Sequence, residues 1–220
     1  MAALGAVVPL IFEAQLIRQK CPCDPGSVNS FDRSIIGKQD AVAGTVSHYI
    51  VALALAAPVT LDLADQGFNK SFVEDLMVFT ESLAINTALS HVARYGVQRP
   101  RPVAYEATPP EIRAGEFLSF YSGHTATVFT GLSAASMTYG YRYGHKVWPW
   151  AVTFGAGFAE SALRVAAGRH FYSDVIVGAV MGTAVGTLVP YFHRRHKGSR
   201  ITLAPALGEP GVLLAWRKEF

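Results

Sequence analysis

Charge is the scarcest feature of this 220-residue sequence. Only 16% of the residues are Asp, Glu, Lys or Arg, well below the roughly 25% typical of soluble globular chains. The net charge is only +3, and basic residues cluster in few places, which argues against a nucleic-acid partner. The length suits one domain with a core of its own.

Cysteine is scarce as well. The two cysteines, Cys21 and Cys23, stand in a Cys-Pro-Cys sequence. Pairing across a single proline conflicts with the geometry that disulfides require, and no matching Cys/His pair lies nearby for a metal site. We therefore expect two ordinary loop cysteines, either as free thiols or with one bond to another chain.

A cleaved secretory signal is also missing. No basic stretch precedes the apolar N-terminal segment, and no clear small-residue cleavage site follows it. Because a soluble exported enzyme would need such a signal, its absence weighs against that class of protein.

Long apolar runs are present instead. The stretches 41–61, 117–141 and 175–192 contain no Asp, Glu, Lys or Arg, and each is near the ~20 residues that cross a hydrocarbon core. Two further runs, 71–93 and 147–167, are apolar but interrupted by acidic residues. Such charges face the interior of a helix bundle or lie near an interface.

These runs predict an all-α fold, a polytopic membrane helix bundle with five firm spans. The segment 2–17 is short, and it is either a clipped first span or an interfacial helix. Periodicity alone does not separate membrane spans from buried helices, so a soluble all-helical protein with very apolar core helices is the alternative.

The end of the chain differs from the rest. We assign residues 1–200 to the membrane domain and residues 201–220 to a separate tail. Two β-prone runs in this tail flank Gly208-Glu209-Pro210-Gly211, which predicts a small hairpin.

Three short polar motifs stand at the edges of the apolar runs. They are Arg94 followed after six residues by Arg101-Pro102, then Ser122-Gly123-His124, then Arg164 with His170 and Asp174. Together they supply guanidinium groups, imidazoles, one carboxylate and a Ser-Gly turn. This set can hold a phosphate and transfer it through histidine. A lone Arg-Pro carries no such signal, as the neighbouring Arg99-Pro100 shows.

Phosphate binding is predicted from the arginines and the Ser-Gly turn. Arginine binds phosphate oxygens bidentately, and backbone amides at a helix N-terminus bind anions. The predicted phosphate-binding residues are Arg94, Arg101, Ser122, Gly123 and Arg164.

The catalytic prediction rests on His170, His124 and Asp174. A neutral His170 imidazole can attack phosphorus and form a phosphohistidine. Asp174, four residues further on, shares a helical face with it and is predicted to orient His170 and stabilise its charge after attack. His124 is predicted to protonate the leaving alcohol and then to activate water. No metal or other cofactor is required, since the guanidinium groups supply the positive charge.

The order and spacing of the motifs resemble the type 2 phosphatidic acid phosphatase (PAP2, or lipid phosphate phosphatase) superfamily over residues 70–192. Its motifs are Lys-x6-Arg-Pro, Pro-Ser-Gly-His and Ser-Arg-x5-His-x3-Asp. Here Arg94 replaces the lysine, Tyr121 the proline and Leu163 the serine. The first change keeps the charge, although the donor geometry differs. The other two bear on substrate choice more than on chemistry. The resemblance implies the same catalytic roles.

The resemblance implies a metal-independent membrane phosphatase that acts on a lipid phosphate or lipid pyrophosphate. Bacterial relatives of this type act on undecaprenyl pyrophosphate, phosphatidylglycerol phosphate, phosphatidate or lipid A phosphates, and the motifs do not choose among them. Soluble acid phosphatases and vanadate-dependent haloperoxidases share the superfamily and form a second hypothesis. A non-catalytic binder of lipid phosphate is a third.

The motifs also predict an orientation. All three fall on one side of the predicted membrane, whereas Lys70 and the basic runs 141–146 and 193–197 fall on the other. A basic excess marks the cytoplasmic side. We therefore expect a bacterial inner-membrane protein whose site faces the periplasm or the exterior, with membrane lipids as partners. The sequence does not indicate an oligomeric state.

Overall fold

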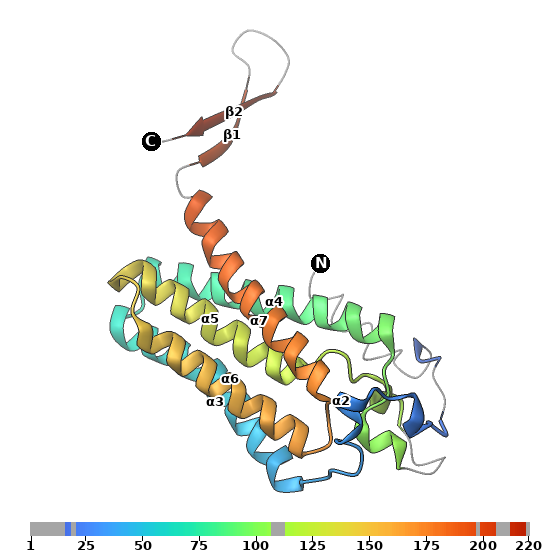
Figure 1. Cartoon of the computed structure of the whole chain (residues 1–220). Helices are drawn as coiled ribbons and strands as arrows, with labels where there is room; N and C mark the ends of the chain where they lie inside the picture. The colour runs from blue at the N-terminus through green and yellow to red at the C-terminus, as the bar shows by residue number, and fades with distance from the viewer. Residues whose placement is uncertain (1–15, 19–20, 107–112, 197–198, 206–211, 219–220) are drawn as a thin grey trace.

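The computed structural model describes residues 16–18, 21–106, 113–196, 199–205 and 212–218. Five long helices form a bundle (Figure 1): α3 (Ala41–Gln66), α4 (Lys70–Val97), α5 (Gly123–Tyr143), α6 (Val147–Ala166) and α7 (Tyr172–His196). The shorter elements are η1 (Pro25–Ser27), α2 (Ser30–Arg33), η2 (Pro102–Tyr105) and η3 (Ala114–Phe117). Each predicted apolar run coincides with a long helix.

Polar side chains set the starts of these helices. The Asp40 carboxylate accepts a hydrogen bond from the amide of Ala43 and caps α3. The Asn69 side chain does the same for the amide of Phe72 at the start of α4. Such caps satisfy amides that have no partner within the helix. Gly67, with a φ of 70°, ends α3 and turns the chain into α4.

Helix α5 lies at the centre of the bundle and packs against α3, α4, α6 and α7. Its contact with α7 is unusually close because glycine recurs at every fourth position of α7. A Cβ atom at Gly178 would lie 2.8 Å from the carbonyl oxygen of Ser122. Glycine stripes of this kind let two helix backbones approach each other. The glycines of the stripe are Gly178, Gly182 and Gly186.

The outer surface of the bundle is apolar. Leu53 and Leu61 on α3, and Val147 and Phe158 on α6, are all more than 60% exposed. Large apolar side chains exposed in such numbers are typical of a surface that contacts lipid or another protein.

Two helices in the described part of the chain are long and apolar enough to cross a membrane, Ala41–Gln66 and Tyr172–Arg194. Only 17% and 33% of their apolar windows are buried inside the protein. The other three long helices carry polar residues that lower their hydropathy, so the prediction of five spans is not confirmed. The predicted segment 2–17 lies almost wholly outside the described residues.

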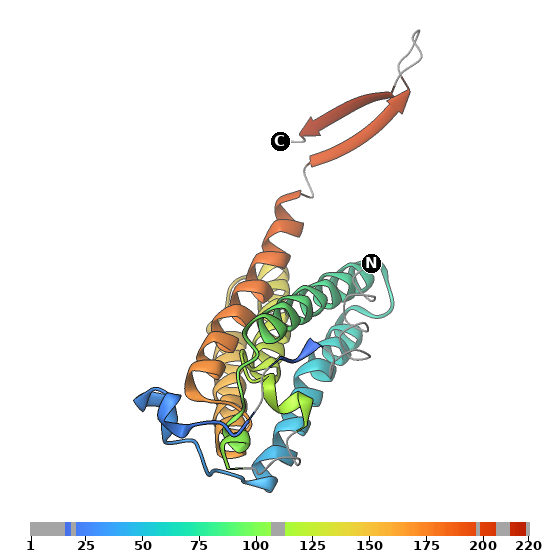
Figure 2. The ribbon, with the colours of Figure 1, turned by 90° about the vertical axis from the view of Figure 1, so that its right-hand side faces the viewer.

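The C-terminal strands β1 (Ser199–Pro205) and β2 (Val212–Lys218) pair antiparallel, with Ser199 opposite Lys218. They project from the end of α7, away from the bundle (Figure 1 and Figure 2). The predicted turn at 208–211 lies outside the described residues, and the division of the chain at residue 200 stays a prediction.

The expectation that Cys21 and Cys23 remain unpaired is wrong, because the structure joins them in a disulfide. Their Cα atoms are 4.4 Å apart, which is at the short end of the range that a disulfide spans. The sulfur of Cys21 lies 3.7 Å from the carbonyl oxygen of Ala104 in η2. The disulfide therefore lies beside the loop that follows α4.

Candidate active site

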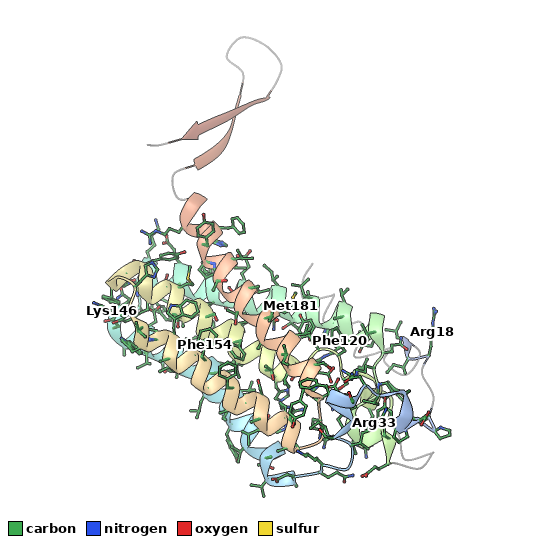
Figure 3. The ribbon with its side chains drawn as sticks, in the orientation of Figure 1. Arg18, Arg33, Phe120, Lys146, Phe154 and Met181 are labelled. Carbon is green, nitrogen blue, oxygen red and sulfur yellow. A yellow bond between two sulfur atoms is a disulfide. The ribbon has the colours of Figure 1, made fainter. Side chains whose placement is uncertain are left out.

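One end of the bundle gathers all the residues predicted for the site. It is formed by the C-terminal turns of α4 and α6, the N-termini of α5 and α7, and the loop that carries η2 and η3. Figure 3 labels Phe120 and Arg33 at this end, and Lys146 at the opposite one. The eight predicted residues are Arg94, Arg101, Ser122, Gly123, His124, Arg164, His170 and Asp174.

The start of α5 is where the predicted Ser-Gly turn lies. Ser122 is the N-cap residue, so the amides of Gly123 and His124 belong to the first turn. A Cβ atom at Gly123 would overlap the guanidinium group of Arg94 and lie 2.9 Å from its Cζ atom. Only glycine allows Arg94 to cross the end of α5, which places a positive charge at an anion-binding helix N-terminus.

Three guanidinium groups surround the two histidines. The charges of Arg94, Arg101 and Arg164 act on both His124 and His170. These arginines come from α4, from the position that begins η2, and from α6. The structure thus assembles a positive cradle from three separate segments, which suits a phosphate group.

Arg164 is the most deeply set of these arginines, with 5% of its surface exposed. Its Nη1 atom donates a hydrogen bond of 3.2 Å to the hydroxyl of Ser47, which in turn donates one of 2.6 Å to Glu160. Among the described residues, the Nε atom of Arg164 has no hydrogen-bond partner. A buried donor of this kind is costly unless it meets an acceptor, and a phosphate oxygen is such an acceptor.

His170 is 1% exposed and is oriented by the main chain. Its Nδ1 atom lies 2.8 Å from the carbonyl oxygen of Ser119. A carbonyl oxygen only accepts, so Nδ1 carries the proton and the lone pair is on Nε2. Burial, together with the charges of Arg101, Arg164 and Arg94, holds the pKa of His170 well below its usual range. The imidazole is therefore neutral at pH 7, as a nucleophile must be.

Asp174 makes no hydrogen bond to His170, so the orienting part of its predicted role is not seen here. Its Oδ2 atom is 3.9 Å from Nδ1 of His170, too far for a hydrogen bond. Instead Oδ2 accepts hydrogen bonds of 2.6 Å from the Ser119 hydroxyl and 2.9 Å from the Phe171 amide. Asp174 therefore holds the two segments on either side of His170, while the carbonyl of Ser119 orients the ring.

Arg99 is a residue of this site that the sequence analysis set aside. Its guanidinium group lies 2.6 Å from Asp174 and 2.8 Å from Asp32, and its Cζ atom is 4.2 Å from the ring centre of Phe171. It therefore ties α2 to the start of α7. No local signal distinguishes Arg99-Pro100 from a chance Arg-Pro pair, because its partners are 67 and 75 residues away.

Asp32 is the second buried carboxylate of this network. Its oxygens accept hydrogen bonds from the backbone amide of Ser173 at 3.0 Å and from the hydroxyl of Ser173 at 2.6 Å. Burial alone would raise the pKa of Asp32. The hydrogen bonds from Arg99, Ser173 and Asn29 outweigh this effect and lower the pKa to about 2. The carboxylate is therefore ionised across the physiological range.

His48 on α3 is a further residue that the sequence analysis did not select. Its Nδ1 atom lies 3.1 Å from Nε2 of His124, and the two ring centres are 5.0 Å apart. The available signal was a histidine inside the run 41–61, which otherwise lacks charged residues.

The described residues also include possible ligands of a metal ion. In the described ranges, no group of three or more His, Cys, Asp or Glu side chains is arranged to hold a metal ion. The prediction of metal-free chemistry stays a prediction.

Comparison with known proteins assigns a family to this arrangement. The model of the PAP2 superfamily matches residues 75–197. Among curated proteins, the lipid A 1-phosphatase of Porphyromonas gingivalis is 27% identical over 181 residues, which cover 78% of this chain and 37% of that protein. The chain therefore spans well under half the length of this relative.

Two solved structures are similar. The crystal structure of Aquifex aeolicus LpxE has a TM-score of 0.48 and 21% identity, covering 71% of this chain and 90% of that one. The PAP2-type phosphatidylglycerolphosphate phosphatase of Bacillus subtilis has a TM-score of 0.54 and 18% identity, covering 88% and 96%. The second likeness shows a common fold.

Proposed function

This chain belongs to the PAP2 superfamily, as its motifs indicated, and on that premise we propose that it is a metal-independent membrane phosphatase. Its substrate is a lipid phosphate or lipid pyrophosphate, and the reaction passes through a phosphohistidine. The observation that carries the proposal is a neutral, buried His170 whose Nδ1 proton is held by Ser119 and which three arginines surround.

The first half-reaction follows from this geometry. Nε2 of His170 attacks phosphorus and forms a P–N bond while the P–O bond to the leaving alcohol breaks. Arg94, Arg101 and Arg164 stabilise the charge on the non-bridging oxygens, which is where most catalysis of phosphoryl transfer lies. His124 gives a proton to the leaving oxygen.

The second half-reaction reverses the roles. Water attacks phosphorus while His124 accepts its proton, and the P–N bond breaks to release phosphate and neutral His170. The imidazole is positively charged only while the phosphoryl group is attached. Asp174, 3.9 Å from Nδ1, and the carbonyl of Ser119 stabilise that charge.

A lipid substrate is supported by the apolar flanks of the bundle. Leu53 is exposed on α3, which is long and apolar enough to cross a membrane, and Phe158 is exposed on α6, which packs against α3. The two relatives whose names state a substrate act on lipid A and on phosphatidylglycerolphosphate. We infer that the head group enters the arginine cradle sideways while the apolar tail stays in the bilayer.

The orientation of the site is supported at both ends of the bundle. The disulfide between Cys21 and Cys23 lies beside η2 at the site end, and disulfides persist in oxidising compartments such as the periplasm. The opposite end carries Arg142 and Lys146, as expected of a cytoplasmic face. The site of an inner-membrane protein would therefore face outward.

The test is phosphate release from a panel of lipid phosphates in detergent with a chelator, comparing the wild type with His170→Ala. Chelator-resistant release that the substitution abolishes is the expected result. Release that requires a divalent metal, or that survives His170→Ala, would contradict the mechanism.

Two other outcomes point to the alternatives. A protein that stays in the supernatant without detergent indicates a soluble relative of the superfamily. A folded protein that binds lipid phosphate but releases no phosphate indicates a non-catalytic binder.

A further inference from the structure

Two side chains from outside the part of the chain that carries the three motifs also contact the proposed site residues. Helix α3 lies outside the segment 75–197 that the family model matches, yet it contributes Ser47 and His48. Ser47 bridges Glu160 and Arg164, and His48 contacts His124.

His48 differs from Ser47 in its surroundings. Ser47 is fully buried, whereas the next residue, His48, is exposed. It lies in an apolar helix where an ionisable side chain has a solvation cost and is by default a functional candidate. Its Nδ1 atom thus contacts His124, while the residue as a whole is exposed on the described bundle.

The distance between the two rings has a chemical consequence. Nδ1 of His48 and Nε2 of His124 are 3.1 Å apart, so one of them must carry a proton and the other a lone pair. A pair of imidazoles sharing one hydrogen bond passes protons readily between its outer nitrogens.

The positive charges near His124 explain why a neighbouring imidazole would help it to donate a proton. The guanidinium groups of Arg164, Arg94 and Arg101 act on His124, and the ring of His48 is its direct neighbour. A positive field opposes the charged imidazolium, which is the form that a general acid uses. A second imidazole at the rim can supply the proton at the moment of transfer.

We propose that His48, in the second turn of α3, is a proton-relay and positioning residue for His124, and that it connects the leaving group to water at the site end of the bundle. This inference rests on the proposed function. A proton enters at Nε2 of His48, the proton on Nδ1 of His48 moves to Nε2 of His124, and the proton on Nδ1 of His124 moves to the leaving oxygen. When water attacks the phosphohistidine, the same three transfers run in reverse.

Leaving-group dependence tests the relay, because only a poor leaving group needs a proton. The probes are a short-chain alkyl phosphate and 4-nitrophenyl phosphate, and the measured quantity is kcat/KM. For His48→Ala we expect a loss of about 10²-fold on the alkyl phosphate, the lower end of what a positioned acid contributes. The loss on 4-nitrophenyl phosphate should be below about threefold, since a phenolate leaves unprotonated.

Three further measurements separate a relay from a merely structural role. His48→Gln keeps a hydrogen-bonding side chain but cannot pass a proton, so it should be as slow on the alkyl phosphate as His48→Ala. Added imidazole should restore His48→Ala on that substrate, because the site of the missing ring is exposed. His145→Ala, in the turn between α5 and α6 at the opposite end, is the matched control and should equal the wild type.

Equal losses on both probes, full activity of His48→Gln on the alkyl phosphate, or no loss in His48→Ala would each overturn the relay. In all three cases the wild type would still release phosphate and His170→Ala would not, so the proposed function would stand. A wild-type protein that is inactive on both probes would overturn the proposed function together with the relay.

Discussion

The two ends of the helical bundle each hold an arginine between two aspartates, but they differ in how they bury these charges. At the active-site end, Arg99 pairs with Asp32 and Asp174, and both carboxylates are 0% exposed. Burial of this kind is tolerated only when every charge is paired and hydrogen-bonded. The network therefore imposes one arrangement on the segments around His170.

At the opposite end, Arg142 pairs with Asp62 and Asp75, whose side chains are 21% and 24% exposed. The hydroxyl of Tyr143 donates to Asp65 in the same region. A mostly apolar cavity of about 530 Å³ lies beside these residues. These pairs lie closer to solvent, so each contributes less to stability.

The difference separates charges that only join helices from charges that can bind a substrate. Both ends use an ion-pair network to join helices. Within the described ranges, only the active-site end adds three further arginines whose charges act on two histidines. An excess of positive charge around the two histidines, rather than the ion pairs themselves, is what suits this end to phosphate.

The largest effect should come from changing one arginine at each end. Arg164→Lys keeps the charge but loses the planar fork, so kcat should fall by about 10²–10³-fold. Arg142→Lys should change kcat by less than about twofold, because Arg142 pairs with Asp62 at the opposite end of the bundle. The measurement is steady-state phosphate release by both variants, and equal losses would break the distinction between the two ends.

The free energy of unfolding should also depend more on the ion pairs at the active-site end than on those at the opposite end. Asp32→Asn removes a buried carboxylate and leaves the partly buried Arg99 without one of its charge partners, so it should lower the free energy of unfolding by about 3 kcal/mol. Asp62→Asn, at the more exposed end, should lower it by less than about 1 kcal/mol. Denaturant titration in detergent measures both, and a larger loss in Asp62→Asn would be the opposite of what burial predicts.

Acid should weaken the active-site end through Asp32. Its pKa is lowered from 3.8 to about 2 in the folded protein, so its contribution is fully present above pH 4 and is lost as the pH falls toward 2. A shift of this size corresponds to roughly 2 kcal/mol. The free energy of unfolding, followed from pH 5 to pH 2, should fall more steeply in the wild type than in Asp32→Asn. Parallel curves would show that Asp32 does not carry this dependence.

A smaller effect is expected from the close contact at the start of α5. Gly123→Ala adds a Cβ atom that overlaps the guanidinium group of Arg94, so the arginine must shift and kcat/KM should fall by about tenfold. Gly155→Ala in α6 is the control, since no described atom lies within 4 Å of its added Cβ. An unchanged kcat/KM in Gly123→Ala would mean that Arg94 does not need this position.

Much of the site was predictable because its parts are local in sequence. Arg164, His170 and Asp174 lie within eleven residues of each other, and Ser122 with Gly123 forms a recognisable helix start. Their helices were predictable from apolar runs of the right length. Motif and helix together place the arginines and histidines at one end of the bundle.

The rest depended on contacts between distant segments. Arg99 could not be told from a chance Arg-Pro pair until Asp32 was placed beside it. His48 carried no motif, and the carbonyl of Ser119 has no side-chain signature at all. The prediction of five membrane spans is not confirmed for a related reason, since a helix packed against other helices, such as α5, is selected for packing as well as for contact with lipid.

The most direct test of the account is to trap the phosphorylated enzyme. His124→Ala should slow the water attack, so its reaction with 4-nitrophenyl phosphate, quenched at alkaline pH and digested, should leave the phosphoryl group on the peptide that contains His170. The same experiment on His170→Ala should give no phosphorylated peptide. A phosphoryl group on another residue, or its absence from His170 while the enzyme turns over, would contradict the phosphohistidine mechanism.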